Sequence, residues 1–159
     1  MKNKIEIVPF TDELADHFSA LNTAWVEKYF ELEPIDIRML ADPKKYYIKE
    51  GGLIFFALLD GEVAGTCALL KVSDAVYELS KMAVYEKFQG KQVGNKMLEY
   101  CLAEARLMKL EKVILYSNTI LNPAIHLYKK YGFTEVIGFE SEYKRANIKM
   151  EIIIKYEQN

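Results

Sequence analysis

The sequence predicts an α/β (α+β) domain with a mixed, mostly antiparallel sheet of about six to seven strands, flanked by about four helices. Three observations favour this class. The chain has 159 residues and is 51% hydrophobic, enough for one domain with a sizeable core. Short segments typical of strands recur along it, and segments with helical apolar periodicity separate several of them. We therefore expect residues 1–159 to form a single domain.

The first third of the chain predicts one strand followed by two helical segments. Residues 4–10 alternate as a strand does, with Pro9 near the sheet margin. Thr11 is expected to be a helix N-cap. A helix is expected from there to about residue 30, because apolar side chains follow at near-helical spacing: Leu14, Phe18, Leu21, Trp25 and Tyr29. A less regular helical stretch, residues 36–50, is interrupted near Pro43 and ends at Gly51 and Gly52.

The middle of the chain predicts a hairpin and a third strand. Residues 53–72 form two apolar runs around Asp60-Gly61, a pair suited to a type I′ turn because both central residues need positive φ. A further strand is expected at residues 76–84.

The second half predicts two crossovers and a final pair of strands. Residues from Gly94 to Met108 carry a helical apolar face, and 112–117 form a short apolar strand. Asn122 is expected to cap a further helix with Pro123 at its first position, and Gly132 to end it. Strands close the chain at about 133–139 and 148–156.

The loop between the third strand and its following helix reads "FQGKQVGNK", residues 88–96. A strand, a short loop and a helix start bring unpaired backbone amides and the positive end of a helix dipole together, which suits phosphate. The loop lacks both the P-loop pattern and the dinucleotide fingerprint. Judged by its two glycines alone, a simple tight turn is the better interpretation.

Composition excludes several classes of function. The net charge of -2 gives no basic field for nucleic acid, and the longest apolar run, residues 53–59, is too short for a membrane span. Two cysteines and two histidines predict no metal site. No signal peptide is apparent at the N-terminus, so we expect a cytoplasmic protein that binds neither nucleic acid nor membrane.

Two segments together resemble the GNAT superfamily of acyl-CoA-dependent N-acyltransferases. They read "ELSKMAVYEKFQGKQVGNKML" and "YSNTILNPAIHLYKKYGF". The first resembles that family's pyrophosphate motif, Q/R-x-x-G-x-G/A, at residues 89–94. The second resembles its next motif at these positions: Asn118, Asn122, Ala124, Leu127, Tyr128, Gly132 and Phe133. The order of expected strands and helices fits the family's layout, a GNAT-like fold, over essentially the whole chain.

The resemblance implies that acetyl-CoA is the acyl donor and lies between the strands at 76–84 and 112–117. It assigns cofactor-binding roles to Met82, Ala83, Val84, Gln89, Gly90, Lys91, Gln92, Val93, Gly94, Asn118, Asn122 and Tyr128. Gln92 departs from the motif where glycine is usual. Its side chain could crowd the phosphates or turn outward and add a donor.

The same resemblance implies two catalytic residues, Tyr128 and Glu78. A phenol of pKa about 10 stays protonated at neutral pH and can protonate a thiolate whose thiol has a pKa of about 8.5. The glutamate would be the general base. Each has a structural alternative, since Glu78 could be an ordinary ion-paired carboxylate and Tyr128 could belong to the core. Asn118 has no evident local structural role.

These observations predict an N-acetyltransferase that moves acetyl from acetyl-CoA to a primary amine by direct attack. A non-catalytic acyl-CoA-binding sensor or interaction module is the alternative, and a plain α/β interaction domain is a second one. The sequence does not identify the acceptor. The resemblance also admits a homodimer.

Overall fold

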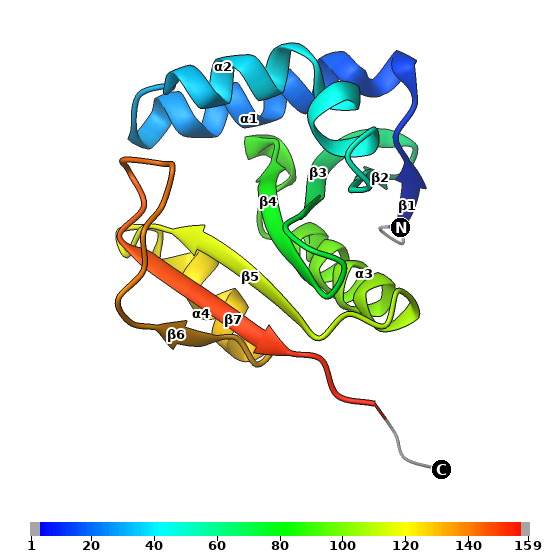
Figure 1. Cartoon of the computed structure of the whole chain (residues 1–159). Coiled ribbons are helices and arrows are strands. Elements are labelled where there is room, and N and C mark those ends of the chain that lie inside the picture. The colour runs from blue at the N-terminus through cyan, green and yellow to red at the C-terminus, as the bar shows by residue number, and fades with distance from the viewer. Residues whose placement is uncertain (1–3, 157–159) are drawn as a thin grey trace.

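A computed structural model describes residues 4–156 and shows the predicted mixed sheet with helices on both faces (Figure 1). The strands are β1 (Ile5–Pro9), β2 (Leu53–Leu59), β3 (Glu62–Lys71), β4 (Val76–Val84), β5 (Lys112–Ser117), β6 (Thr134–Val136) and β7 (Ile148–Ile153). The α-helices are α1 (Ala15–Tyr29), α2 (Pro34–Ala41), α3 (Val93–Leu107) and α4 (Asn122–Lys130). Short 3₁₀ turns occupy Asp12–Leu14 and Glu86–Phe88, and a π-helical turn occupies Lys44–Ile48.

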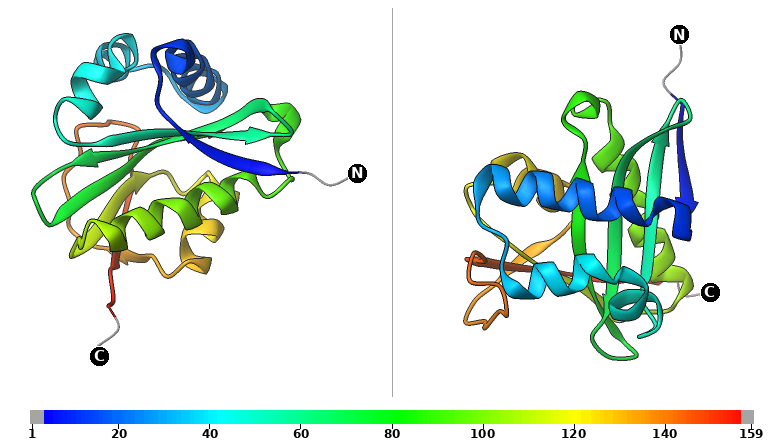
Figure 2. Two further views of the ribbon diagram at one scale, coloured as in Figure 1. Left: turned by 90° about the vertical axis from the view of Figure 1, so that its right-hand side faces the viewer. Right: turned by 90° about the horizontal axis from the view of Figure 1, so that it is seen from above.

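The helices cover the two faces of the sheet in pairs (Figure 2). One face packs against α1 and α2 through a cluster that includes Phe18, Tyr47 and Phe56. The other packs against α3 and α4 through a larger cluster that includes Met97 and Met150. The apolar face of α3 is buried as its spacing predicts, and the free cysteines Cys67 and Cys101 lie in this larger core.

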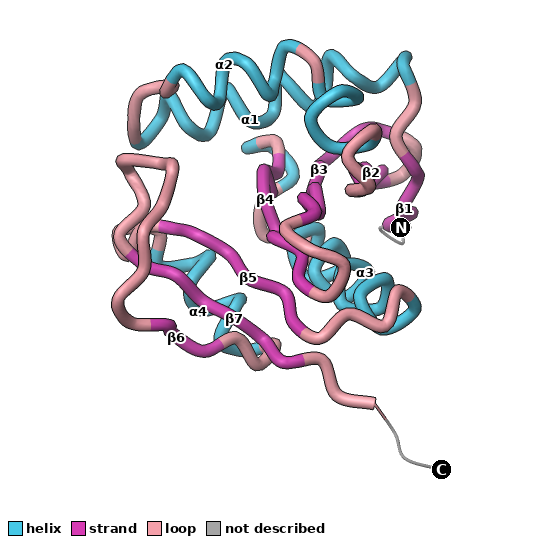
Figure 3. Tube along the Cα trace, in the orientation of Figure 1, coloured by secondary structure: helices cyan, strands magenta, loops and turns pink. Residues whose placement is uncertain are grey.

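The sheet order is β1-β2-β3-β4-β5-β7-β6, and every neighbouring pair is antiparallel except β4 and β5. This parallel pair is short: its register runs only from Val76–Lys112 to Glu78–Ile114. Beyond that point the two strands diverge, as the tube in Figure 3 shows. The sheet is therefore split at its centre, between the carboxyl halves of β4 and β5.

Thr11 holds an N-cap position, but it is that of the 3₁₀ turn and has no side-chain cap hydrogen bond, and α1 begins only at Ala15. The cap predicted at Asn122 is wrong. Asn122 is the first residue of α4 and not its cap, because Leu121 holds the N-cap position. The closing strands are also shorter than expected: β6 ends at Val136, where the loop to β7 begins, and β7 ends at Ile153. The type I′ turn is confirmed by positive φ at Asp60 (50°) and Gly61 (86°).

Within residues 4–156, no helix is long and apolar enough to cross a membrane. The same residues contain no cluster of histidine, cysteine or acidic side chains that could hold a metal ion.

Candidate functional site

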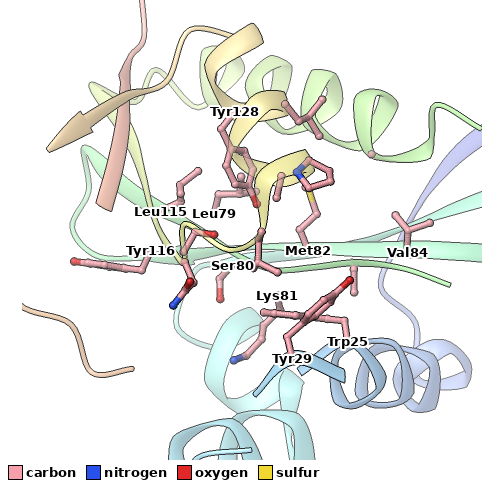
Figure 4. A pocket seen from close by; sticks show the side chains of 18 of the residues that line it. Trp25, Tyr29, Leu79, Ser80, Lys81, Met82, Val84, Leu115, Tyr116 and Tyr128 are labelled. Atoms are coloured by element: carbon pink, nitrogen blue, oxygen red, sulfur yellow. The ribbon is translucent and has the colours of Figure 1, made fainter. Parts of the chain in front are cut away.

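The split in the sheet opens into a cavity of about 560 Å³. Its walls come from β4 and β5, the loop before α3, the first turns of α4 and the end of α1. Figure 4 shows Tyr128 entering from the α4 side, with Trp25 and Tyr29 on α1 across the cavity and Met82 between them. Elements far apart in sequence thus meet around this one cavity.

A β-bulge shapes the β4 wall. Thr66 pairs with Ala83 but Ala68 pairs with Ser80, so Cys67 alone faces two residues of β4. One of them, Lys81, has a φ of 54°, a left-handed conformation that is costly for a residue other than glycine. The bulge lies where β4 has lost β5 as a partner. Residues 79–84 therefore present a free strand edge to the cavity.

The loop before α3 supplies free backbone donors. The amides of residues 90–95 donate to no other group in the described part of the chain, and they include the first turn of α3. Gly90 and Gln92 both have positive φ, 77° and 68°, which explains why glycine suits either position. Gln92 accepts a hydrogen bond from Asn95 through Oε1, at 2.7 Å. The arrangement fits an anionic group such as a pyrophosphate.

Most residues that the resemblance assigned to cofactor binding do line this cavity. They are Met82, Ala83, Val84, Gln89, Gly90, Gln92, Val93, Gly94, Asn118 and Tyr128. Lys91 and Asn122 are exposed and do not line it. Lys91 remains near enough in sequence to add positive charge around the loop, whereas Asn122 only begins α4.

Tyr128 lies near the middle of the cavity. Its ring packs against Phe133, with centroids 5.9 Å apart, and 8% of the residue is exposed. Its hydroxyl has no hydrogen-bond partner among residues 4–156, although it lines the cavity. Burial raises the pKa of this phenol well above its usual value, so it stays protonated at neutral pH. Tyr128 is both a core side chain and an available proton donor.

Glu78 lines the same cavity, at the last position where β4 pairs with β5. It forms no ion pair among the described residues, so the alternative of an ordinary ion-paired carboxylate is not what the structure has. The pKa of its carboxyl is raised to about 7, mainly by burial and to a smaller extent by Glu142, while Lys81 and Lys149 oppose the shift. A carboxyl with this pKa can accept a proton near neutral pH.

Lys81 instead belongs to a buried ionic cluster with Asp36, Arg145 and Glu33. Its Nζ lies 2.7 Å from Asp36 Oδ1, and its side chain is 3% exposed. Arg145 donates to both Asp36 oxygens at 2.6 and 2.9 Å, and to Glu33 at 3.1 Å. Burial opposes ionisation of Asp36, but the bonds from Arg145 and Lys81 prevail and lower its pKa to about 2.

Asn118 has a structural role that the sequence did not suggest. Its side-chain amide donates to the carbonyl of Arg145 at 2.7 Å, and its oxygen accepts from the amide of Ile120 at 3.0 Å. It thereby ties the end of β5 to the loop before β7. Any contact that Asn118 makes with a ligand is additional to this role.

Sequence reasoning missed the ionic cluster, because Asp36 and Arg145 are 109 positions apart. One local signal was present. In "EPID" the Glu33 amide donates to Asp36, three residues later, a spacing typical of a helix start. That signal places Asp36 at the start of α2 but says nothing of its cationic partners.

A split sheet, a free strand edge and a loop with free amides are features of a class of protein suited to an extended, phosphate-bearing molecule beside the strand. Residues 50–135 match the family model described as an acetyltransferase (GNAT) domain. The chain belongs to the GNAT acetyltransferase family, as its motifs predicted.

Known proteins agree with this assignment. N-acetylaspartate synthetase of Mus musculus is 33% identical over 96 residues, which are 59% of this chain and 32% of the relative. Streptothricin acetyltransferase of Escherichia coli is 25% identical over 142 residues, covering 82% and 80% of the two chains. The chain thus spans only about a third of the mouse relative's length.

Solved structures share the fold. A GNAT-family acetyltransferase of Staphylococcus aureus superposes with a TM-score of 0.86 at 16% identity, covering 96% of this chain and 100% of the other. The PaiA N-acetyltransferase of Thermoplasma acidophilum, solved in complex with coenzyme A, gives a TM-score of 0.72 at 16% identity and covers 94% and 99%. The predicted GNAT-like fold is confirmed.

Proposed function

We propose that this protein is an N-acetyltransferase that transfers acetyl from acetyl-CoA to a primary amine by direct attack. One observation carries the proposal. A partly buried carboxyl with a pKa near neutrality and a protonated tyrosine without a hydrogen-bond partner among residues 4–156 face one cavity, beside a free strand edge and a loop with free amides. A non-catalytic sensor would not require either titratable group.

The donor fits the residues present. Free amides of residues 90–95 and the N-terminus of α3 suit the pyrophosphate, with Lys91 close in sequence. The unpaired edge of residues 82–84 suits the amide groups of the pantetheine arm, which would add to the sheet as a further strand. A Cβ built on Gly90 meets nothing within 4 Å, so the space beside this loop is open.

The chemistry follows from the two titratable groups. Glu78 accepts a proton from the acceptor ammonium, so that the nitrogen lone pair attacks the acetyl carbonyl carbon. Backbone amides at the bulge of β4 are placed to stabilise the oxyanion. As the C–S bond breaks, Tyr128 protonates the thiolate, and the attacking nitrogen gives up its second proton, which restores the Tyr128 hydroxyl; Glu78 releases its proton to solvent. The products are the N-acetylated amine and free CoA thiol.

Direct attack is favoured over a covalent acetyl-enzyme. Both cysteines are buried, with Cys67 at 0% and Cys101 at 1% exposure, and neither lines the cavity. Burial raises the pKa of the Cys67 thiol, which disfavours the nucleophilic thiolate.

The proposal is tested by calorimetric titration with acetyl-CoA, followed by a thiol-release assay over an amine library. We expect saturable binding and amine-dependent release of thiol. Binding without release for any amine would support the sensor instead, and no binding would leave only an interaction domain.

The relatives suggest acceptors but do not assign one. The mouse relative's name points to aspartate and the Escherichia coli relative's name to streptothricin. A cytoplasmic location and a homodimer are part of the proposal; light scattering of the purified protein tests the latter.

A further inference from the structure

The acceptor side of the cavity has an aromatic wall at the end of α1. Trp25, Tyr29 and Phe30 line it, and the Phe30 ring lies 6.4 Å from each of the other two, centroid to centroid. Tyr29 is 48% exposed, so this wall is not sealed into the core. Figure 4 shows Trp25 and Tyr29 facing the strand residues across the cavity. Such a surface binds flat or aliphatic groups.

Two more tyrosines line the cavity, one from β5 and one from the loop before β7. Tyr116, on β5, packs against Phe139 with centroids 5.9 Å apart. Tyr143, in the loop before β7, lies beneath the Arg145 guanidinium at 4.7 Å and the Lys81 ammonium at 4.6 Å. The cavity therefore has aromatic side chains from α1, β5 and the loop before β7.

The two cations near this space are already neutralised. Lys81 and Arg145 face Asp36 and Glu33, two positive groups against two negative ones. The side chains of Asp36 and Glu33 are 0% and 15% exposed. A substrate carboxylate that took either cation would compete with Asp36, which both cations share, and taking Arg145 would also leave Glu33 without its partner; weakening such a buried pair is unfavourable.

Glu78 is the carboxyl that remains for the substrate. It has no ion-pair partner within the described residues, and the charged groups around it are Lys81, Glu142 and Lys149. Lys149 is directed to the Tyr116 ring, with its Nζ 5.7 Å from the centroid. The acceptor side therefore offers an acid and aromatic rings, but no uncompensated cation lining the cavity.

We propose that the acceptor is a primary amine on an aromatic or aliphatic body, without a carboxylate beside the amine. This inference rests on the proposed function and specifies its substrate class. The ammonium lies at Glu78 and the body lies against Trp25, Tyr29 and Phe30. An α-amino acid such as aspartate brings a carboxylate into a cavity whose lining cations, Lys81 and Arg145, are already paired with acids.

Matched pairs of amines test the inference directly. Thiol release is measured with saturating acetyl-CoA for phenethylamine against phenylalanine, tyramine against tyrosine, and isoamylamine against leucine, with aspartate added. Within each pair the two amines share one body and differ by the carboxylate. We expect kcat/KM to be at least about tenfold higher for the member without it, a difference of about 1.4 kcal/mol.

The outcomes separate the two proposals. Equal or faster release with the amino acids, or with aspartate, overturns the substrate class while the proposed function stands. Acetyl-CoA binding without release for any amine overturns the proposed function and this inference with it.

A charge variant tests the physical cause. Glu33→Gln keeps the side chain's shape but leaves Arg145 under-neutralised, so the preference of tyramine over tyrosine should shrink several-fold. Glu135→Gln, an exposed change of the same charge on β6, should leave that ratio unchanged. An unaltered ratio in Glu33→Gln would overturn the charge argument.

Discussion

The two ends of the cavity present different chemical groups: mainly backbone amides at one end and side chains at the other. At the donor end, the loop before α3 and the free edge of β4 offer backbone amides. At the acceptor end, the walls are side chains from α1, β4, β5 and the loop before β7, and the cluster around Asp36 ties Lys81 and Arg145 of these walls to α2. Backbone donors tolerate changes in side chain as long as the conformation is kept, whereas the acceptor end depends on each side chain.

This difference predicts where substitutions act. Changes at the acceptor end should alter stability and substrate choice, and changes at the donor end should alter affinity for acetyl-CoA alone. Four substitutions, from the largest expected effect to the smallest, would sharpen or break the distinction.

Asp36→Asn should have the largest effect. It leaves Lys81 and Arg145 without their shared carboxylate, which we expect to reduce the free energy of unfolding by about 3–5 kcal/mol. Urea denaturation measures it. Asp16→Asn, an exposed change on α1, should stay within about 0.5 kcal/mol of the wild type. Similar stability of the two variants would show that the cluster is not a structural unit.

The same carboxylate predicts a pH dependence of stability. The pKa of Asp36 is about 2 in the folded protein against 3.8 as its ordinary value. Its contribution is therefore complete above about pH 4 and is lost as the pH falls toward 2, with a total of roughly 2 kcal/mol. Asp36→Asn should show a correspondingly smaller loss over that interval in denaturation curves.

Tyr128→Phe should lower kcat by about 100-fold, because the departing thiolate loses its proton donor. The dissociation constant for acetyl-CoA should stay within about twofold, since the hydroxyl contributes little surface. Tyr100→Phe, on α3 and outside the cavity, is the control and should keep wild-type turnover. Wild-type turnover in Tyr128→Phe would remove this residue from the mechanism.

Gly94→Val should weaken acetyl-CoA binding by about tenfold, or about 1.4 kcal/mol, by blocking approach to the amides of the loop. A Cβ at this position would lie 3.4 Å from Leu127 Cδ2, an ordinary contact, so Gly94→Ala should fold normally and lose less affinity. Calorimetry measures both. An unchanged dissociation constant in Gly94→Val would refute the pyrophosphate assignment.

Gln92→Gly should have the smallest effect. The side chain bonds Asn95, and the backbone already has the conformation that glycine favours, so acetyl-CoA affinity should stay within about threefold. Tightening of tenfold would mean that the side chain crowds the phosphates. Loosening of tenfold would mean that its amide binds them.

The donor end was largely predictable from the sequence, and the acceptor end was not. The strand before residue 85, the loop glycines and the helix after them are contiguous, so local patterns placed Gly90, Gly94 and the free amides together. The hairpin at Asp60-Gly61 was predictable for the same reason. Asp36 and Arg145 meet only because the chain returns across the sheet after more than a hundred residues. No local pattern carries that information.

The bulge in β4 was also not predictable from the sequence. The alternation of residues 76–84 predicts a regular strand, in which Glu78 and Lys81, three residues apart, would point to opposite faces. The bulge breaks this alternation, and Lys81 pairs with Asp36. The Lys81–Asp36 pair thus depends on a backbone irregularity that residue types do not reveal.

The pH dependence of kcat tests the central claim most directly, with both substrates saturating and an amine whose own pKa lies near 10. Glu78 is ionised only above its pKa of about 7, so wild-type kcat should rise with pH and level off above that value. Glu78→Gln should be much slower and continue to rise through pH 9, following the free amine. A Glu78→Gln profile with the height and plateau of the wild type would contradict the account.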